Sequence, residues 1–319
     1  MFKDKLEGDN GQGLLYTVDE NNIEYRCSAK LMKKSLEEIA GRAFAQCDEA
    51  EEDKLIILME EIKKILASDD VQGKMSRVPL TPSGYAKRYI KEHTVYSENQ
   101  KVKSVYGKLM SNLTLNEKSY KYVACAYQGG FCQANPNYVG QKLENIVSFD
   151  INSAYPSAIM SHEFPMDSGH FEHLTLKELE LKLKSKLAIF FIKFKGLKSK
   201  GDFAFPINKN SCRLDDAVGI KFYNNKVISA QEVIVSMTNV DYECYKRYYS
   251  WESIEIMGDV LLYEKSLLPP HFLNSILHFY EEKTKLKGIP EKKNDYYRAK
   301  EKLNSCIGII IERFHQKEN

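Results

Sequence analysis

A short apolar run that carries an acid near its end constrains this chain more than any other feature. The run spans residues 146–151, Ile-Val-Ser-Phe-Asp-Ile, and Asn152, Ser153 and a Tyr-Pro pair follow it closely. Such a run, bounded by turn residues, predicts a buried strand and then a helix. Asp150 would lie at the end of that strand. Its carboxylate and the carbonyl of Ile151 can hold a hard cation there, although an aspartate in this position more often caps a turn.

Periodicity elsewhere along the chain predicts an α+β fold with helical insertions. The chain is expected to change to strands and turns from Tyr122, with further β-rich segments at 187–194 and 227–236. Helices are expected at 29–66, 85–93, 268–287 and 295–314. The polar stretch 68–76 is the best candidate for a domain boundary.

Composition narrows the class of protein. The 319 residues, 43% of them hydrophobic, are enough for two domains or one large one. No apolar run is long enough to cross a bilayer, and no secretory signal begins the sequence, so we expect a cytoplasmic protein without a membrane partner. The seven cysteines are scattered singly, which predicts reduced thiols and no zinc site.

Charge is more informative locally than overall, because the net charge is only +2. The stretch from Lys283 to Lys302 contains eight basic and three acidic residues, and the stretch from Asn99 to Tyr122 contains five lysines and one glutamate. Basic stretches with interleaved tyrosines suit phosphate contacts and base stacking. The ordinary alternative is that these lysines form solvated faces.

The segment that begins at Asp150, Asp-Ile-Asn-Ser-Ala-Tyr-Pro-Ser, resembles the first palm signature of family B DNA polymerases, D-x-x-S-L-Y-P-S, with Ala154 in place of leucine. Residues 300–308, Lys-Glu-Lys-Leu-Asn-Ser-Cys-Ile-Gly, are similar to the second signature, K-x-x-x-N-S-x-Y-G, of the fingers helix. Ile307 replaces the tyrosine there, so nucleotide affinity or fidelity is expected to suffer.

Tyr127-Gln128-Gly129-Gly130 resembles the Y-x-G-G element that joins the exonuclease and polymerase domains in the protein-primed branch of this family, which is found in phages and linear plasmids. Segments 79–91 and 238–241 also look like that branch. Because the matches follow the family's order, the chain is identified as similar to a protein-primed family B DNA polymerase.

The resemblance implies nucleotidyl transfer assisted by two Mg²⁺ ions. Asp150 and the carbonyl of Ile151 would be metal ligands, and Asp150 and Lys300 the catalytic residues, Lys300 offering its cation to the triphosphate. The implied nucleotide-binding residues are Tyr155, as a steric gate under the sugar, Lys283 and Asn304. The implied DNA-binding residues are Tyr127, Gly129, Gly130, Ser305, Gly308 and Arg88. Without the resemblance, Tyr155 would be interpreted as a core aromatic and the Lys300 helix as a solvated face.

The same resemblance implies a domain plan. Residues 1–77 would be a mostly helical remnant of an exonuclease domain and residues 78–319 a partial polymerase domain. The latter divides into an antiparallel palm at 120–205, an insertion at 206–265 and helical fingers at 266–319.

Two family elements are missing from the sequence. The third palm signature, Y-x-D-T-D-S, would supply a second aspartate, and Asp-Thr-Asp does not occur. We therefore expect no polymerisation by this chain alone. The exonuclease acids are missing too: Asp48 or Asp53 matches the last of them only partly and is better interpreted as a helix start, so no proofreading is expected.

Three hypotheses remain. The chain is part of a DNA-directed DNA polymerase, either truncated or completed by a second polypeptide, with template-primer DNA and dNTPs as partners. Alternatively, it is an inactive remnant that binds single-stranded DNA or a priming protein. An unrelated α+β protein with accidental matches would have no basic cleft beside Asp150.

Overall fold

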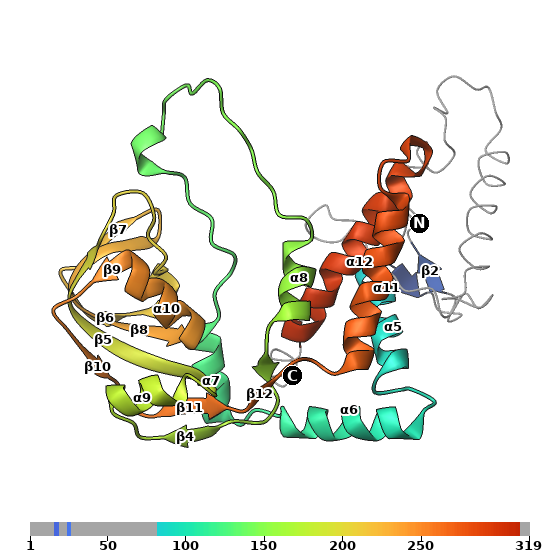
Figure 1. The fold of residues 1–319 in the computed structure, drawn as a ribbon, viewed down its shortest axis with the longest axis horizontal. Coiled ribbons are helices and arrows are strands. Elements are labelled where there is room, and N and C mark those ends of the chain that lie inside the picture. The colour runs from blue at the N-terminus through green and yellow to red at the C-terminus, as the bar shows by residue number, and fades with distance from the viewer. Residues whose placement is uncertain (1–15, 19–23, 27–81, 313–319) are drawn as a thin grey trace. The chain divides into compact units, whose positions relative to one another are not determined.

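The computed structural model describes residues 16–18, 24–26 and 82–312 (Figure 1). β1 (Tyr16–Val18) and β2 (Glu24–Arg26) form an antiparallel pair. The helices expected at 29–66 and the boundary expected at 68–76 lie outside the described residues, and the exonuclease remnant therefore stays a prediction.

The chain divides into two compact units. One comprises Met1–Lys103 with Pro269–Asn319, and the other is Ser104–Leu268. The predicted division into palm, insertion and fingers is not tested by these units. The chain returns to the first unit at Pro269, close to the predicted start of the fingers.

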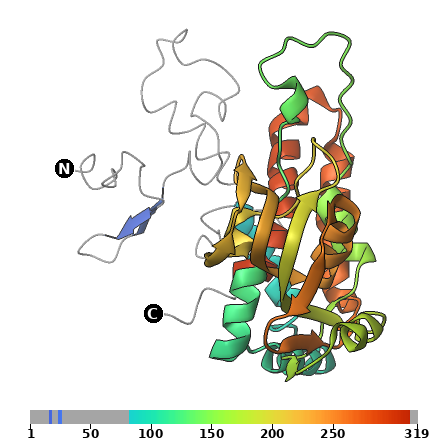
Figure 2. The ribbon, with the colours of Figure 1, turned by 90° about the vertical axis from the view of Figure 1, so that its left-hand side faces the viewer.

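An antiparallel sheet dominates the second unit (Figure 2). Its long central pair confirms both predicted β-rich segments, with partners running from Ile189↔Thr238 to Lys198↔Ser229. The main strand order is β4 (His170–Glu172), β11 (Val260–Tyr263), β5 (Leu187–Ser199), β8 (Lys226–Thr238) and β6 (Cys212–Val218). β9 (Tyr249–Ser250) and β10 (Ser253–Ile256) pair with β5, and β7 (Lys221–Tyr223) pairs with β8.

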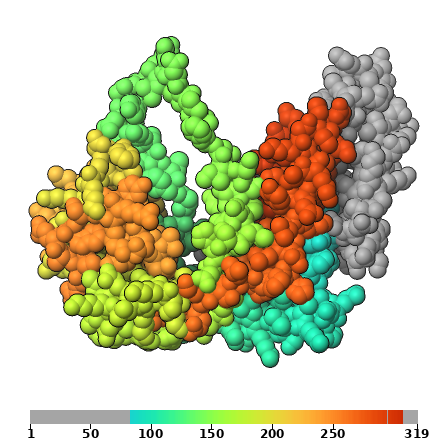
Figure 3. All heavy atoms as spheres, viewed as in Figure 1, coloured from blue at the N-terminus to red at the C-terminus, as the bar shows by residue number. Residues whose placement is uncertain are grey.

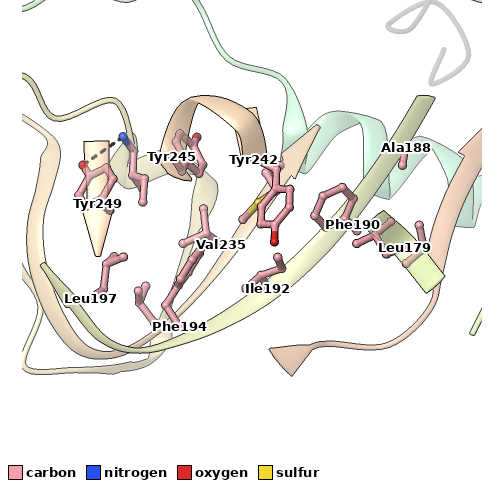
Figure 4. Packing of buried hydrophobic residues seen from close by; sticks show 14 of the residues in the cluster. Leu179, Ala188, Phe190, Ile192, Phe194, Leu197, Val235, Tyr242, Tyr245 and Tyr249 are labelled. Atoms are coloured by element: carbon pink, nitrogen blue, oxygen red, sulfur yellow. Dashed lines mark hydrogen bonds between the residues drawn. The ribbon is translucent and has the colours of Figure 1, made fainter. Parts of the chain in front are cut away.

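Alternation along β5 builds the core of this unit. Phe190, Ile192 and Phe194 share one face of the strand and are fully buried, because successive strand residues point to opposite faces. α9 (Leu176–Lys182) and α10 (Asn239–Tyr248) contribute buried side chains to the same cluster, and the Tyr242 ring meets the Phe190 ring edge-on at 5.8 Å (Figure 4). Each large apolar side chain buried here contributes about 1.5–3 kcal/mol.

A capping box starts α10. The Thr238 Oγ1 accepts a hydrogen bond from the Asp241 amide at 3.2 Å, and the Asp241 carboxylate accepts from the Thr238 amide at 2.9 Å. Thr238-Asn239-Val240-Asp241 had been matched to the protein-primed branch. In this fold its first and last residues begin a helix.

Tyr122 lies in a helix, contrary to the prediction from the sequence. The change to strands expected at this residue is wrong, because α7 (Glu117–Ala126) is a helix that begins where the Asn116 side chain accepts from the Ser119 amide at 2.9 Å. Polar capping at Asn116 overrides the local strand propensity of the tyrosines. Tyr122 packs edge-on against Phe171 and Phe191 of the sheet, at 5.0 Å from each ring.

Three helices form the described core of the first unit. α5 (Pro82–His93), α11 (Pro270–Leu286) and α12 (Lys293–Glu312) confirm the predicted helices, and the one-turn helix η5 (Pro290–Lys292) marks the predicted break. Tyr89 of α5 stacks on His278 of α11 at 4.5 Å.

The remaining elements are short, apart from α6 (Gln100–Asn112), which crosses from one unit to the other. They are η3 (Pro136–Tyr138), α8 (Ala154–Ser161), η4 (Lys209–Ser211) and the pair β3 (Phe164–Pro165) and β12 (Lys265–Ser266). Among the residues described, none of the helices combines the length and apolar character that a membrane span requires.

Candidate functional site

Asp150 lies on extended chain that belongs to no strand. The buried strand predicted for residues 146–151 is wrong: Phe149 is 91% exposed and Ile151 is 74% exposed. An apolar run becomes a strand only where its backbone is paired, and within the described chain no backbone hydrogen bond reaches residues 147–151. The Asp150 side chain and its neighbours therefore face solvent.

The turn after Asp150 forms as the sequence predicts. Ser153 takes the left-handed conformation with φ 51°, and its carbonyl accepts the first bond of α8 from the Ser157 amide at 3.0 Å. Pro156 and Ile159 bury the inner side of this helix. Tyr155 is 60% exposed, so it is no core aromatic.

The structure brings Tyr155 and Gly130 together. A Cβ atom on Gly130 would stand 3.2 Å from the Tyr155 hydroxyl oxygen, whereas one on Gly129 would meet nothing within 4 Å. The two glycines of the Y-x-G-G element therefore differ in how much free space surrounds them. The second allows the tyrosine hydroxyl to lie close to the main chain.

Two glutamines that the sequence analysis missed hold this element to the sheet unit. The Gln128 side chain donates to the Tyr245 hydroxyl at 2.9 Å, and the Gln133 side chain bonds the backbone of both Phe203 and Phe205, at 3.1 and 3.0 Å. Burial raises the pKa of Tyr245, so its hydroxyl stays protonated. No sequence signal distinguishes these glutamines from surface residues.

Aromatic rings are exposed on both sides of the paired glycines. Tyr127 ends α7 and is 57% exposed. Phe131 is equally exposed, and the Lys226 ammonium lies 5.2 Å from its ring centroid. Lys226 itself is buried, at 8% exposure, so it is the two exposed rings that are suited to stacking on bases.

In the helical unit, Lys300 and Asn304 lie one turn apart on α12, and both are exposed. Residues at this spacing share a helix face, so the structure presents both predicted nucleotide contacts together. Lys283 of α11 is half-buried, with its ammonium 5.0 Å from the Tyr280 ring centroid.

Two predicted DNA contacts take part in helix packing. The Ser305 hydroxyl lies 2.7 Å from the Ser83 hydroxyl of α5. Arg88 lies 3.6 Å from Glu92 and 5.7 Å from the Tyr85 ring centroid, and its side chain is only 21% exposed. Gly308 lies on α12 in a stretch whose side chains are outside the described residues.

An ion pair joins the two long helices. The Lys302 ammonium donates to Glu282 at 3.0 Å and lies 5.5 Å from the Tyr85 ring centroid, with only 12% of the Lys302 side chain exposed. The sequence places Lys302 in the basic stretch 283–302, interpreted either as suited to phosphate contacts or as a solvated face, and neither interpretation predicts its burial. Its burial orients the helix face that carries Lys300.

The comparisons with known proteins agree with this geometry. The family model for DNA polymerase type B, organellar and viral, matches residues 93–309. The chain belongs to this family of polymerases. The predicted family B resemblance is thereby confirmed, and accidental matching is excluded.

Solved structures of a phage DNA polymerase share the fold of this chain. Phi29 DNA polymerase with primer-template DNA and incoming nucleotides matches with a TM-score of 0.66 and 18% sequence identity. The same enzyme with primer-template DNA alone matches with a TM-score of 0.61 and 19% identity. Each match covers 95% of this chain and 52% of the phage chain, so this polymerase chain spans about half the length of those relatives.

At this level of identity the likeness to phi29 polymerase establishes a shared fold. It agrees with the predicted phage-type branch. No curated protein matches the polymerase chain in sequence.

The donor chemistry at Asp150 fits the Mg²⁺ that polymerases of this family use. A carboxylate and the adjacent carbonyl of Ile151 are the hard oxygen ligands that this ion prefers. Within the described part of the polymerase chain, no cluster of three or more histidine, cysteine or acidic side chains could hold a metal ion. One carboxylate and one carbonyl would fill only part of the coordination shell of such an ion.

Proposed function

We propose that this chain supplies the nucleotide-binding face and one metal-binding carboxylate of a template-directed DNA polymerase. The observation that carries the proposal is the short path from Asp150 through the Ser153 turn to Tyr155, whose hydroxyl approaches Gly130. It agrees with the family assignment and with the order of the signatures.

Each residue has a separate task in this proposal. Mg²⁺, when bound, would stabilise the attacking 3′-oxygen and the leaving pyrophosphate. Asp150 and the carbonyl of Ile151 hold that ion. Tyr155 lies under the sugar and excludes a 2′-hydroxyl by its bulk.

The basic hairpin of α11 and α12 binds the triphosphate. Lys300 meets the phosphates as a point charge, Asn304 lines the pocket one turn further along, and Lys283 is a second phosphate contact. Lys302 acts indirectly, because its ion pair with Glu282 joins the two helices.

DNA contacts come from exposed rings and the paired glycines. Tyr127 and Phe131 stack on template bases, while Gly129 and Gly130 admit the backbone of the DNA strand. Arg88, Ser305 and Gly308 keep their predicted DNA-binding roles in this proposal, and Ser305 also contacts Ser83 of α5.

A second function, binding without chemistry, is favoured by one observation. Asp150 is the sole carboxylate of the palm signatures in this sequence, which contains no Asp-Thr-Asp. A protein of this kind would hold single-stranded DNA or a priming protein and would catalyse no nucleotidyl transfer.

Primer extension with Mg²⁺ and dNTPs tests the enzymatic proposal, and anisotropy on single-stranded DNA at several salt concentrations tests binding. We expect binding that weakens with salt, with no extension by this chain alone. Lys300→Ala should weaken dNTP binding about tenfold, whereas Lys285→Ala, an exposed lysine on the same hairpin, should leave it unchanged.

Extension that Asp150→Asn abolishes would mean that another carboxylate of this chain completes the site. Extension restored by adding a polypeptide with the third signature would favour a split enzyme. Absence of DNA binding at low salt would contradict both functions.

A further inference from the structure

Two glutamines attach the Y-x-G-G element to the sheet unit from both of its ends. Gln128 donates from its side-chain amide to the Tyr245 hydroxyl at 2.9 Å. The Gln133 amide nitrogen donates to the Phe203 carbonyl at 3.1 Å, and its amide oxygen accepts from the Phe205 amide at 3.0 Å. Both glutamines are half-buried, whereas all four residues between them are exposed. Their amides are therefore turned toward the protein.

The groups that these amides bond are themselves well fixed. Tyr245 belongs to α10 and is 1% exposed, and its ring meets the Tyr249 ring edge-on at 6.3 Å. Phe205 is also buried. A side chain that is hydrogen-bonded to groups locked by packing has a defined position of its own. The two glutamines are therefore anchors for the chain between them.

Gly130 lies between the two anchors, two residues after Gln128 and three before Gln133. Because extended chain spans at most about 3.3–3.6 Å per residue, anchors this close restrict where the glycine backbone can lie. The restriction matters here because paired glycines otherwise have a wide choice of backbone conformation. Figure 3 shows the chain between α7 and α8, in green, as a narrow arch, and both glutamines belong to its first residues, soon after α7 ends.

The position of Gly130 in turn limits the ring of Tyr155. A Cβ atom at Gly130 would stand 3.2 Å from the Tyr155 hydroxyl oxygen, which is a tighter approach than most Cβ contacts. The other end of the side chain is fixed by α8, whose Pro156 and Ile159 are buried. A ring that is fixed by its helix at one end and bounded by main chain at the other has little room to tilt.

We propose that Gln128 and Gln133 are positioning residues for sugar discrimination. They hold Gly130 beside the Tyr155 hydroxyl, and the ring is thereby kept where its bulk excludes a 2′-hydroxyl. This role rests on the proposed function, in which Tyr155 lies under the sugar of the incoming nucleotide. Neither glutamine has to touch the nucleotide, because a misplacement of about 1 Å in a functional group can cost on the order of 100-fold in rate.

Fluorine NMR of the fluorotyrosine-labelled chain tests the positioning and needs no nucleotide. The Tyr155 resonance is assigned from the signal that disappears in Tyr155→Phe. It should shift in Gln128→Leu, because Gly130 loses one anchor. Tyr245→Phe removes the acceptor of the same hydrogen bond, keeps the buried ring and should shift the resonance in the same way. Combining the two changes should add nothing further, since both remove one interaction.

Two matched controls separate positioning from general damage. Tyr242 lies on the same helix as Tyr245 and is equally buried, but its hydroxyl donates to a glutamate of α9 at 3.2 Å. Gln141 lies further along the arch, and its amide donates to the backbone carbonyl four residues earlier. Tyr242→Phe and Gln141→Leu should leave the Tyr155 resonance where it is in the wild type.

Sugar discrimination is the second readout, and a purely structural role would not change it. It is measured as the ratio of the dissociation constants of the chain for ATP and dATP in the presence of Mg²⁺. The ratio should fall about tenfold in Gln128→Leu and in Gln133→Leu, while the affinity for dATP stays near its wild-type value. Tyr155→Ala removes the ring itself and gives the full size of the effect. Both control variants should keep the wild-type ratio.

The two readouts distinguish failure of this role from failure of the proposed function. A Tyr155 resonance that stays unchanged in both glutamine variants would overturn the positioning, whatever the chain binds. A resonance that shifts while the sugar ratio keeps its wild-type value would overturn the specificity role. A wild type that binds neither nucleotide would contradict the proposed function and overturn the specificity role with it, while the resonance would still show whether the glutamines hold Tyr155.

Discussion

The hydroxyl of Tyr155 approaches the main chain at Gly130 so closely that a methyl group there would stand 3.2 Å from the oxygen. Alanine at position 130 should therefore push the Tyr155 ring aside, which is possible because the ring is exposed. With fluorotyrosine incorporated, the ¹⁹F resonance of Tyr155 should shift in Gly130→Ala. Gly129→Ala, which meets nothing within 4 Å, should leave it in place. Identical spectra for both variants would contradict this relationship.

Lys302 should matter more for stability than its exposed neighbours. Its ammonium donates to Glu282 at 3.0 Å and its side chain is 12% exposed, so Lys302→Ala removes buried packing and leaves a half-buried carboxylate without its partner. We expect a loss of about 1–3 kcal/mol in the free energy of unfolding by urea. Lys285→Ala removes an exposed pair with Glu281 and should cost less than about 0.5 kcal/mol. Equal losses of unfolding free energy in the two variants would show that the Lys302–Glu282 pair stabilises the protein no more than an exposed pair does.

Thr238→Ala removes the side-chain acceptor that begins α10. Its hydroxyl bonds the Asp241 amide, and such caps contribute about 1 kcal/mol. Thermal unfolding should show this loss, while Val240→Ala, at a residue 68% exposed on the same helix, should change stability by less than about 0.5 kcal/mol. A Thr238→Ala variant as stable as wild type would mean that the helix is held by its packing alone.

Burial should protect two thiols from alkylation. It raises the pKa of Cys212 and of Cys306 to about 12, so at pH 8 both are protonated and unreactive. Cys125 and Cys132 are exposed. Mass spectrometry after brief iodoacetamide treatment should find label at the exposed pair and not at partly buried Cys212 or buried Cys306. The buried thiols should react only after unfolding, and their early labelling in the native protein would show that the core opens readily.

Much of the fold was predictable because local patterns agree with tertiary packing. The β-rich composition of 187–194 predicted β5 correctly, since the apolar residues of that stretch are largely buried in the sheet. The break at Gly288 separated two helices because glycine and proline there stop either helix from continuing. The signature order from Asp150 to Lys300 predicted the family.

The wrong predictions have a common physical cause. They concern residues whose secondary structure or burial depends on an interaction partner that cannot be recognised from the local sequence. Residues 146–151 have a strand composition but no strand beside them in the described chain. Lys302 and Glu282 are twenty residues apart, and nothing in a lysine-rich stretch marks one member as shielded. Tyr122 was assigned by propensity, which a side-chain cap at Asn116 overrides.

The left-handed residues at Asn145 and Ser153 give the segment between them a thermodynamic role. Ordering extended backbone costs about 1–2 kcal/mol per residue. A ligand bound at Asp150 would have to offset part of that cost for the residues between the two turns, so its measured affinity would be lower than the contacts at the carboxylate alone would give.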